Sequence, residues 1–353
     1  MVRLEAMVAN GTRKQSINNK EDDMKFDFKK LALGVALGFT LLGGAAAVAQ
    51  DAKHEIVTVV KLSGIAWFNR MEAGVAEYAE ETGNNATQVG PASADAALQV
   101  QMIEDLIARN VNAITVVPNS PEALEPVLAK ALEAGIKVVG HEASSLENVT
   151  YDVEAFDNAA YGVHLMEALA QDMGGEGEYA VFVGHLTAKT HNEWVDAAIA
   201  YQKEKYPKMT LVGGKIESNE QQQTAYQKTK ELLRTYPNLK GIQGSAGEDV
   251  VGAALAVEEA GLTGKVTIVG TSLVSVAGPY LETGEIKMIS FWDPAKAGIA
   301  MNKVAAMAIE GKEVTDGMDL GVEGYNSVKL DGKVIYGQAW VDVTKDNMDE
   351  YDF

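Results

Sequence analysis

Polar and aromatic residues follow many of the short apolar runs in this chain, at the points where buried strands would end. Lys61 comes directly after residues 56–60, and Glu142 comes shortly after residues 137–140. A carboxylate accepts hydrogen bonds from neighbouring hydroxyl groups, whereas lysine, histidine and asparagine donate to hydroxyl or carbonyl oxygens. Aromatic rings stack on the C–H faces of sugars and polyols. We therefore predict a site for a small polyhydroxylated ligand, formed by Lys61, Trp67, Phe68, Glu142, His191, Asn192, Ala246, Ser272, Trp292 and Asp293.

Several of these residues also suit an ordinary structural role. Trp67 and Phe68 are typical core residues, and a place on a solvated rim is the alternative for Lys61. Asp293 precedes Pro294, which is the usual chemistry of a helix start. These structural alternatives stay open at this point.

Recognisable catalytic motifs are absent from the sequence. The chain contains no GxSxG, no GxxxxGK(S/T), no HExxH, and no GxGxxG between a strand and a helix. With five histidines and no cysteine, we expect neither a transition-metal site nor a cofactor. We expect a binding protein rather than an enzyme. The alternative is an exported sugar-processing enzyme in which Glu142 and Asp293 act as an acid and base pair.

The composition points to a soluble, acidic protein of about two domains. The chain has 353 residues, of which 47% are hydrophobic and 23% are charged. The chain contains 30 basic and 50 acidic residues, which gives a net charge of -20. Such a balance argues against nucleic acid as a partner, because phosphates attract basic surfaces.

Residues 1–49 have the features of an export signal. Residues 24–30 form a short basic segment, and residues 31–42 are apolar apart from glycine and threonine. Residues 47–49 fit the small-x-small cleavage rule. We expect translation to start at Met24, cleavage to occur between Ala49 and Gln50, and the mature protein to lie in the periplasm. A membrane anchor is the alternative, although glycine and alanine interrupt the apolar run. Loss of residues 1–49 removes seven basic and five acidic residues, which leaves 23 against 45 and a net charge of -22.

Beyond the leader, short apolar strands alternate with amphipathic helices. Strands are expected at 56–60, 113–117, 137–140 and 179–183, near 211, 242 and 288, and at 266–269. Helices are expected at 67–81, 97–110, 120–135, 193–206, 224–235 and 250–260, with Pro126 delaying or kinking the third. This alternation indicates parallel sheets covered by helices on both faces. Residues 133–140 recur in similar form at 259–270, which favours two similar lobes.

From residue 54 to 353 the chain resembles the type I periplasmic sugar-binding proteins of ABC transporters, in the branch of ribose, rhamnose and autoinducer-2 receptors. The segments that carry the resemblance are 60–62 with 67–68, 99–101 with 105–107, 113–118, 192–195, 233 with 236–239, 292–293, and 345–353. The resemblance implies an α/β fold of two Rossmann-like lobes with parallel sheets, joined at a hinge by three crossings. The lobes would be residues 50–155 and 156–290, with 291–353 crossing back to supply a helix of the first lobe and the C-terminal segment. It further implies a monomer that encloses its ligand by hinge closure and delivers it to an ABC permease and its ATPase in the inner membrane.

The resemblance also implies roles for individual residues. Lys61 matches a ligand-contacting lysine of autoinducer-2 receptors, and Trp67 and Phe68 match the paired stacking aromatics of ribose receptors. Glu142 matches an aspartate that both groups use on a ligand hydroxyl.

The chain departs from the autoinducer-2 pattern at three places. Thr190 and His191 replace Asp-Gln, Ser245 replaces a proline, and Glu142 is longer than the usual aspartate. We therefore expect a monosaccharide such as rhamnose or a pentose, or a small polyol, with autoinducer-2 as the alternative ligand. A LacI-type regulator would share the lobes, but it would need a basic helix-turn-helix before them.

Overall fold

The computed structural model describes residues 53–353 of the chain. The predicted signal peptide and its cleavage site lie outside the described residues and remain predictions. Every helix within residues 53–353 is too short or too polar to cross a membrane.

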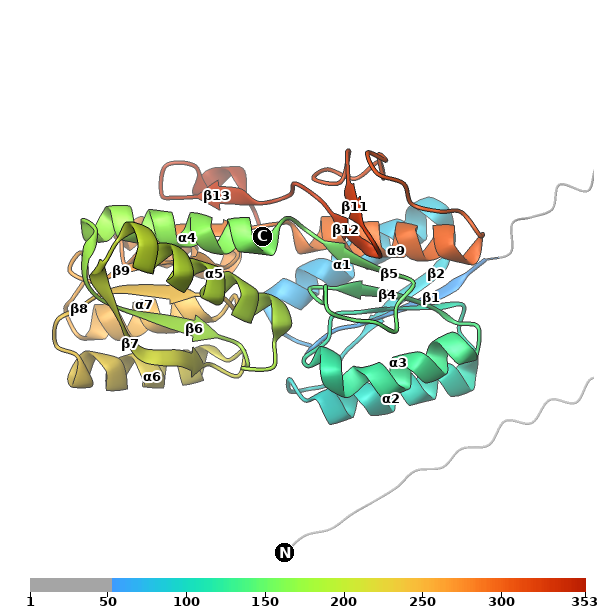
Figure 1. The fold of residues 1–353 in the computed structure, drawn as a ribbon, viewed down its shortest axis with the longest axis horizontal. Helices are drawn as coiled ribbons and strands as arrows, with labels where there is room; N and C mark the ends of the chain where they lie inside the picture. The colour runs from blue at the N-terminus through green and yellow to red at the C-terminus, as the bar shows by residue number, and fades with distance from the viewer. Residues whose placement is uncertain (1–52) are drawn as a thin grey trace, which may run out of the picture. The chain divides into compact units, whose positions relative to one another are not determined.

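Strands and helices alternate along most of the described chain (Figure 1). The strands are β1 (Glu55–Val59), β2 (Asn85–Val89), β3 (Ala113–Val116), β4 (Lys137–His141), β5 (Tyr151–Glu154), β6 (Glu176–Val183), β7 (Lys208–Glu217), β8 (Leu239–Gly244), β9 (Thr267–Thr271), β10 (Ile286–Phe291), β11 (Lys329–Asp331), β12 (Val334–Tyr336) and β13 (Val341–Val343). The helices are α1 (Ala66–Thr82), α2 (Ala96–Arg109), α3 (Pro121–Glu133), α4 (Asn158–Met173), α5 (Lys189–Lys205), α6 (Gln222–Thr235), α7 (Asp249–Glu259), α8 (Val274–Thr283), α9 (Pro294–Ile309) and a short 3-10 turn (Met348–Glu350).

Two separate sheets define two lobes within the described chain. The first lobe holds the sheet β11-β12-β5-β4-β3-β1-β2, and the second lobe holds the sheet β13-β10-β9-β8-β6-β7. The strands are parallel except where β11 pairs with β12 and β10 with β13. The described chain passes between the sheets three times, after β5, after β10 and after β12. The predicted α/β class with two lobes is therefore confirmed.

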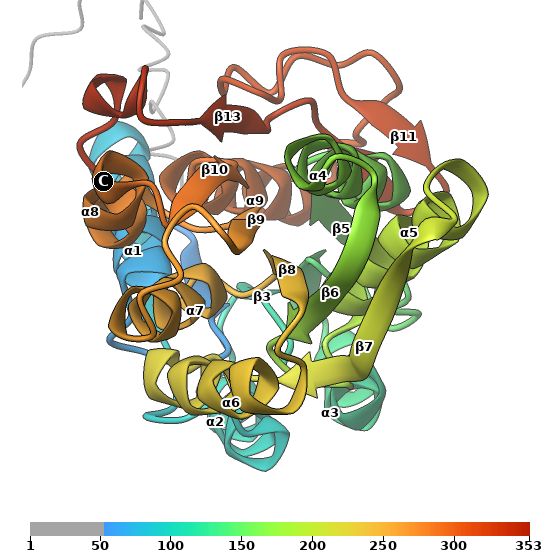
Figure 2. The same cartoon turned by 90° about the vertical axis from the view of Figure 1, so that its left-hand side faces the viewer.

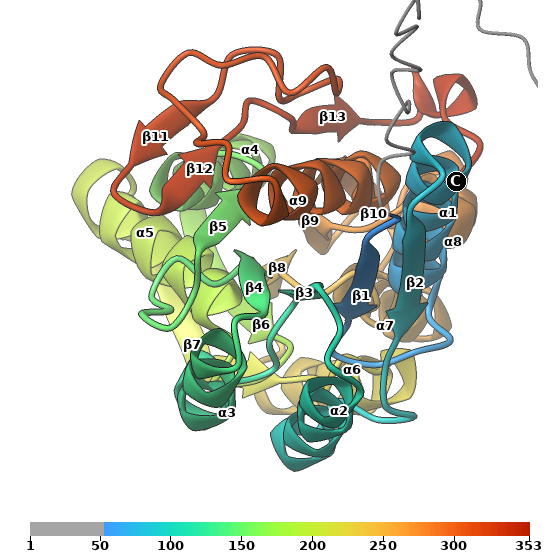
Figure 3. The same ribbon diagram turned by 90° about the vertical axis from the view of Figure 1, so that its right-hand side faces the viewer.

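In the first lobe, helices cover both faces of the sheet (Figure 3). Helices α1 and α9 pack together on one face, and α2 and α3 pack on the other. Strand β3 is buried along its whole length, as expected for a central parallel strand. Gly74 allows α1 to approach α9 closely, since a Cβ atom there would lie 2.1 Å from the carbonyl oxygen of Ala295.

The second lobe repeats this layering (Figure 2). Helices α4 and α5 lie on one face of its sheet, and α6 and α7 lie on the other. Gly162 brings α4 against α5, because a Cβ atom there would lie 2.1 Å from the carbonyl oxygen of Trp194. Both lobes thus turn the carboxyl ends of their central strands toward loops that supply polar residues.

Some elements differ from the sequence prediction. Strand β2 was not predicted, because it is a partly exposed edge strand in which polar residues predominate. Helix α3 continues through Pro126 without a break. Helix α5 begins at Lys189 rather than near Glu193, so Thr190, His191 and Asn192 lie in its first turn and not in the preceding loop.

Candidate ligand-binding site

A small cavity lies where the carboxyl ends of strands from both sheets meet. In an open parallel sheet, ligands bind beyond the strand ends, next to the point where the strand order reverses. The cavity volume is about 20 Å³, which is about the space of one water molecule. Its walls are formed by Lys61, Ile65, Trp67, Phe68, Glu142, His191, Glu220, Ser245, Ala246, Gly247, Thr271 and Trp292.

Three buried charged residues meet in this cavity. The Lys61 Nζ donates a hydrogen bond of 2.6 Å to Glu142 Oε2 and lies 3.6 Å from Glu220 Oε1. The exposed fractions are 3% for Lys61 and 5% for each glutamate. Since Glu142 belongs to the first lobe and Glu220 to the second, Lys61 links the two lobes.

The ion pair sets the protonation of its members. Burial by itself lowers the pKa of Lys61, but Glu142 and Glu220 outweigh that effect, so the pKa lies above its ordinary value. Burial by itself raises the pKa of Glu142, but Lys61 and His141 outweigh it, and the pKa lies below its ordinary value. Both groups are therefore charged at neutral pH.

Both glutamates extend from unusual backbone. Glu142 has a φ of 55° directly after β4, and Glu220 has a φ of 57° shortly after β7. Asn219 has a φ of 56°, so two consecutive residues are left-handed there. Longer side chains rarely adopt this conformation, and such strain is concentrated at functional sites.

His191 adds a neutral ring to the cavity. The Gly184 N–H donates to His191 Nδ1 at 3.1 Å, which places the ring proton on Nε2. Burial, followed by the charge of Lys61, lowers the pKa of His191 to about 4. Lys61 is therefore the one cation among the described residues that line the cavity, and it faces two carboxylates.

Aromatic rings form the apolar wall. The rings of Trp67 and Trp292 meet edge to face, with centroids 4.7 Å apart. Phe68 is 2% exposed, and all three residues also belong to the hydrophobic core. The Trp292 Nε1 is buried and has no hydrogen-bond partner within residues 53–353, which leaves it free to donate to a ligand.

Seven of the ten predicted site residues line the cavity, and three do not. Asn192 Nδ2 donates to the backbone carbonyls of His185, Leu186 and Ala188, so it closes the loop before α5. Ser272 Oγ donates to the carbonyl oxygen of Gly247.

Asp293 also lies outside the cavity lining. Its carboxylate caps α9 by accepting from the Ala295 N–H at 2.9 Å, and it pairs with Arg70 through bonds of 2.8 and 2.7 Å. The alternative role of helix cap therefore describes Asp293 in this structure. Glu142 and Asp293 do not face each other across this cavity, as an acid and base pair would.

The prediction also missed several lining residues: Ile65, Glu220, Ser245, Gly247 and Thr271. Glu220 was missed because only the middle of β7 was recognised in the sequence, so the residue beyond its end was not considered. Ser245 and Gly247 flank Ala246 in the loop after β8. The loop around Ala246 was the sequence feature from which both residues could have been predicted.

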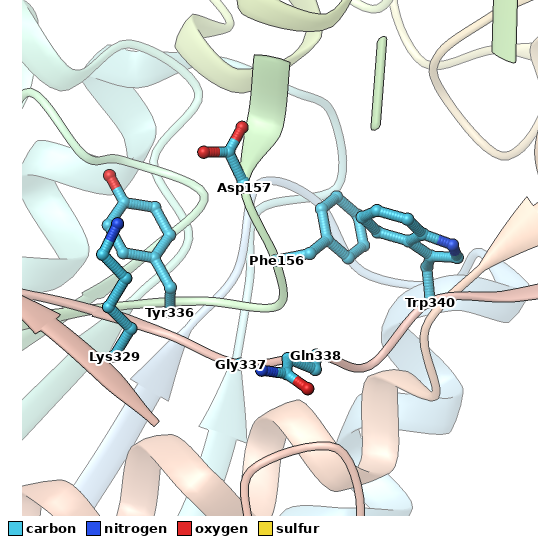
Figure 4. A pocket seen from close by; sticks show the side chains of 7 residues that line it. All are labelled: Phe156, Asp157, Lys329, Tyr336, Gly337, Gln338 and Trp340. Carbon is cyan, nitrogen blue, oxygen red and sulfur yellow. The ribbon is translucent and has the colours of Figure 1, made fainter. Parts of the chain in front are cut away.

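A larger cavity of about 440 Å³, which shares no lining residue with this site, lies beside two of the three crossings (Figure 4). Phe156 and Trp340 stand on one side of it, with Tyr336 and Lys329 on the other. Because its walls combine two crossing segments with residues of β11 and β12, we call it the hinge cavity. A change in the lobe arrangement would change its shape.

Comparison with known proteins identifies the family of this chain. The model of the periplasmic binding protein domain matches residues 56–313. The chain is 28% identical to the xylitol-binding protein of Mycolicibacterium smegmatis over 79% of each chain. It is also 28% identical to the D-allose-binding periplasmic protein of Escherichia coli, over 73% of this chain and 86% of that protein.

Solved structures give the same result for the fold. The structure of LsrB from Clostridium saccharobutylicum in complex with AI-2 has a TM-score of 0.78 and 24% sequence identity, and the match covers 85% of this chain and all of that one. The chain thus has two sheets joined by three crossings and a cavity between their strand ends. The family model matches most of the described residues. The chain belongs to the periplasmic binding protein family.

Proposed function

We propose that this protein is a periplasmic receptor that captures a small sugar or polyol between its lobes and passes it to an ABC importer. The main support is the buried cavity at the strand ends, which combines two carboxylates, an ammonium group, a neutral histidine and aromatic rings that meet edge to face. The relatives from Mycolicibacterium smegmatis and Escherichia coli are binding proteins for a pentitol and a hexose, and both compounds belong to the class of small sugars and polyols. We assign ligand contacts to Lys61, Trp67, Phe68, Glu142, His191, Ala246 and Trp292, together with Glu220 and Ser245.

The size of the cavity implies an opening step. A space for about one water molecule does not admit a sugar, so the lobes must separate before the ligand enters. Ligand contacts to both lobes would then favour closure in proportion to the difference in affinity between the open and closed states. The three crossings are the segments that would bend.

The importer would bind at the rims of the cleft. Two large hydrophobic residues are exposed among the described residues, Leu98 at 37% and Leu186 at 55%. Leu98 lies in the first turn of α2 in the first lobe, and Leu186 lies in the loop before α5 in the second. Closure changes the spacing between the lobes, so a permease contacting both residues would recognise the loaded receptor.

A thermal-shift screen followed by calorimetry tests the receptor function. The mature chain from Gln50 is mixed with xylitol, D-allose, D-ribose, L-rhamnose and autoinducer-2. A ligand at 100 times its Kd should stabilise the protein by about 2.7 kcal/mol. Absence of a shift with every member of the panel would contradict the proposal. Incubation of each compound with the protein, followed by product analysis, separates a receptor from an enzyme.

A further inference from the structure

The charges that line the cavity do not balance. One ammonium group, that of Lys61, faces two carboxyl groups, those of Glu142 and Glu220, and His191 is neutral because burial lowers its pKa to about 4. A buried charge needs a partner, since removal from water disfavours an ion that is left unpaired. One carboxylate in this cavity therefore lacks a full counter-ion.

The geometry identifies Glu220 as that carboxylate. Lys61 is hydrogen-bonded to Glu142 at 2.6 Å, whereas its distance to Glu220 Oε1 is 3.6 Å. Glu220 Oε1 is buried and has no hydrogen-bond partner within residues 53–353. A further acidic group of the second lobe lies near Glu220, since Glu220 contributes, after burial, to raising the pKa of Glu248.

We propose that the ligand is an amino polyol or amino sugar whose protonated amine binds Glu220. This inference depends on the proposed receptor function. The ligand hydroxyl groups would bind Lys61 and Glu142, as in a neutral sugar, while the ammonium group supplies the missing charge. A charge-assisted hydrogen bond to a desolvated carboxylate is stronger than one from a hydroxyl group.

The ligand class is tested with a matched pair of probes, xylitol and 1-amino-1-deoxyxylitol. Calorimetry at pH 7 should give a Kd for the amine at least tenfold lower than the Kd for xylitol. Glu220→Gln keeps the side-chain shape but removes the charge, so it should abolish or reverse this preference. Glu231→Gln, at an exposed position of α6 in the same lobe, should leave the preference unchanged. If Glu220→Gln does not fold, Glu220→Asn serves instead, because asparagine tolerates the left-handed backbone found there.

The outcomes separate this inference from the receptor function. Equal or tighter binding of xylitol by the unmodified protein would overturn the amine assignment and leave the receptor function standing. A preference for the amine that persists in both Glu220 variants would also overturn it. Xylitol binding with uptake of one proton, seen as a heat that depends on the ionisation enthalpy of the buffer, would show that Glu220 is neutralised by protonation instead. Absence of binding by both probes and by every sugar in the screen would overturn both proposals.

Discussion

Lys61 carries its charge where almost no water reaches it. Its ammonium group is held by Glu142 in its own lobe and lies near Glu220 from the other. A buried ion pair contributes little net stability compared with an apolar pair, but removal of one member leaves the other uncompensated. Neutralisation of Glu142 should therefore affect the stability of the fold as well as binding, because Glu142 is the hydrogen-bond partner of Lys61.

Lys61→Met should lower the free energy of unfolding by about 3 kcal/mol, since Glu142 and Glu220 then lose their cation. The addition of Glu142→Gln to Lys61→Met should recover part of this loss. Urea denaturation measures both effects. The control is Lys130→Met, which breaks the exposed pair of Lys130 with Glu104 and should change stability by less than 1 kcal/mol. Equal effects of the two lysine substitutions would contradict the importance given to burial.

At the scale of elements, the start of α7 holds a loop that lines the cavity. The Asp249 carboxylate accepts from the N–H groups of Ser245 at 3.0 Å and Ala246 at 2.8 Å. Burial raises the pKa of Asp249 to about 7, even though these bonds favour the ionised form. The folded protein thus binds a proton at Asp249 over a pH range in which the unfolded chain has released it.

The contribution of Asp249 to the free energy of unfolding therefore falls as the pH rises from about 4 to about 7. Asp249→Asn keeps an oxygen acceptor but cannot ionise. The stability of the variant relative to the unmodified protein should increase by up to about 1.4 kcal/mol per pH unit across this interval and level off above pH 7. Denaturation curves at pH 4.5, 5.5, 6.5 and 8 measure the trend. Asp105→Asn, at an exposed position of α2, should show no such trend. A pH-independent difference for Asp249→Asn would refute the assignment.

At the scale of the whole molecule, several contacts join the lobes. The Thr187 hydroxyl group donates to the carbonyl oxygen of Asn119 at 3.3 Å. The guanidinium group of Arg70 in α1 lies 4.0 Å from the ring centre of Phe353. Phe353 is fixed to the second lobe, because its carbonyl oxygen accepts from the Ser275 N–H at 3.0 Å. Arg70 therefore ties a helix of the first lobe to the C-terminal residue held by the second.

Arg70→Met should shift the ligand-free protein toward an open arrangement, because it removes both the Asp293 pair and the contact with Phe353. Small-angle scattering should show a larger radius of gyration than for the unmodified protein, and a bound ligand should reduce the difference. Arg109→Met removes the exposed pair with Glu55 inside the first lobe and is the matched control. Identical scattering from the two variants would exclude Arg70 as an inter-lobe tie.

The alternation of apolar strands and amphipathic helices was enough to predict an α/β fold with two lobes, because a parallel sheet needs helices on both faces. The positions of Lys61 and Glu142 were predictable for a related reason. In a parallel sheet all the carboxyl ends lie at one edge, so the residue after a buried strand is directed to that edge. Elements with weaker patterns were lost, such as the edge strand β2 and the end of β7.

The tertiary structure decided which of the residues at the strand ends share one cavity. Asn192 was predicted as a ligand contact, but α5 begins earlier than its periodicity indicated, and the amide bonds the backbone carbonyls of the preceding loop. Asp293 was also predicted as a ligand contact, but it caps the N-terminus of α9 and pairs with Arg70. Glu220, far along the chain from Lys61, enters the cavity through left-handed backbone that no periodicity encodes. Local sequence determines where a strand ends, whereas the direction of the next side chain depends on backbone angles and partners that come together only when the two lobes pack.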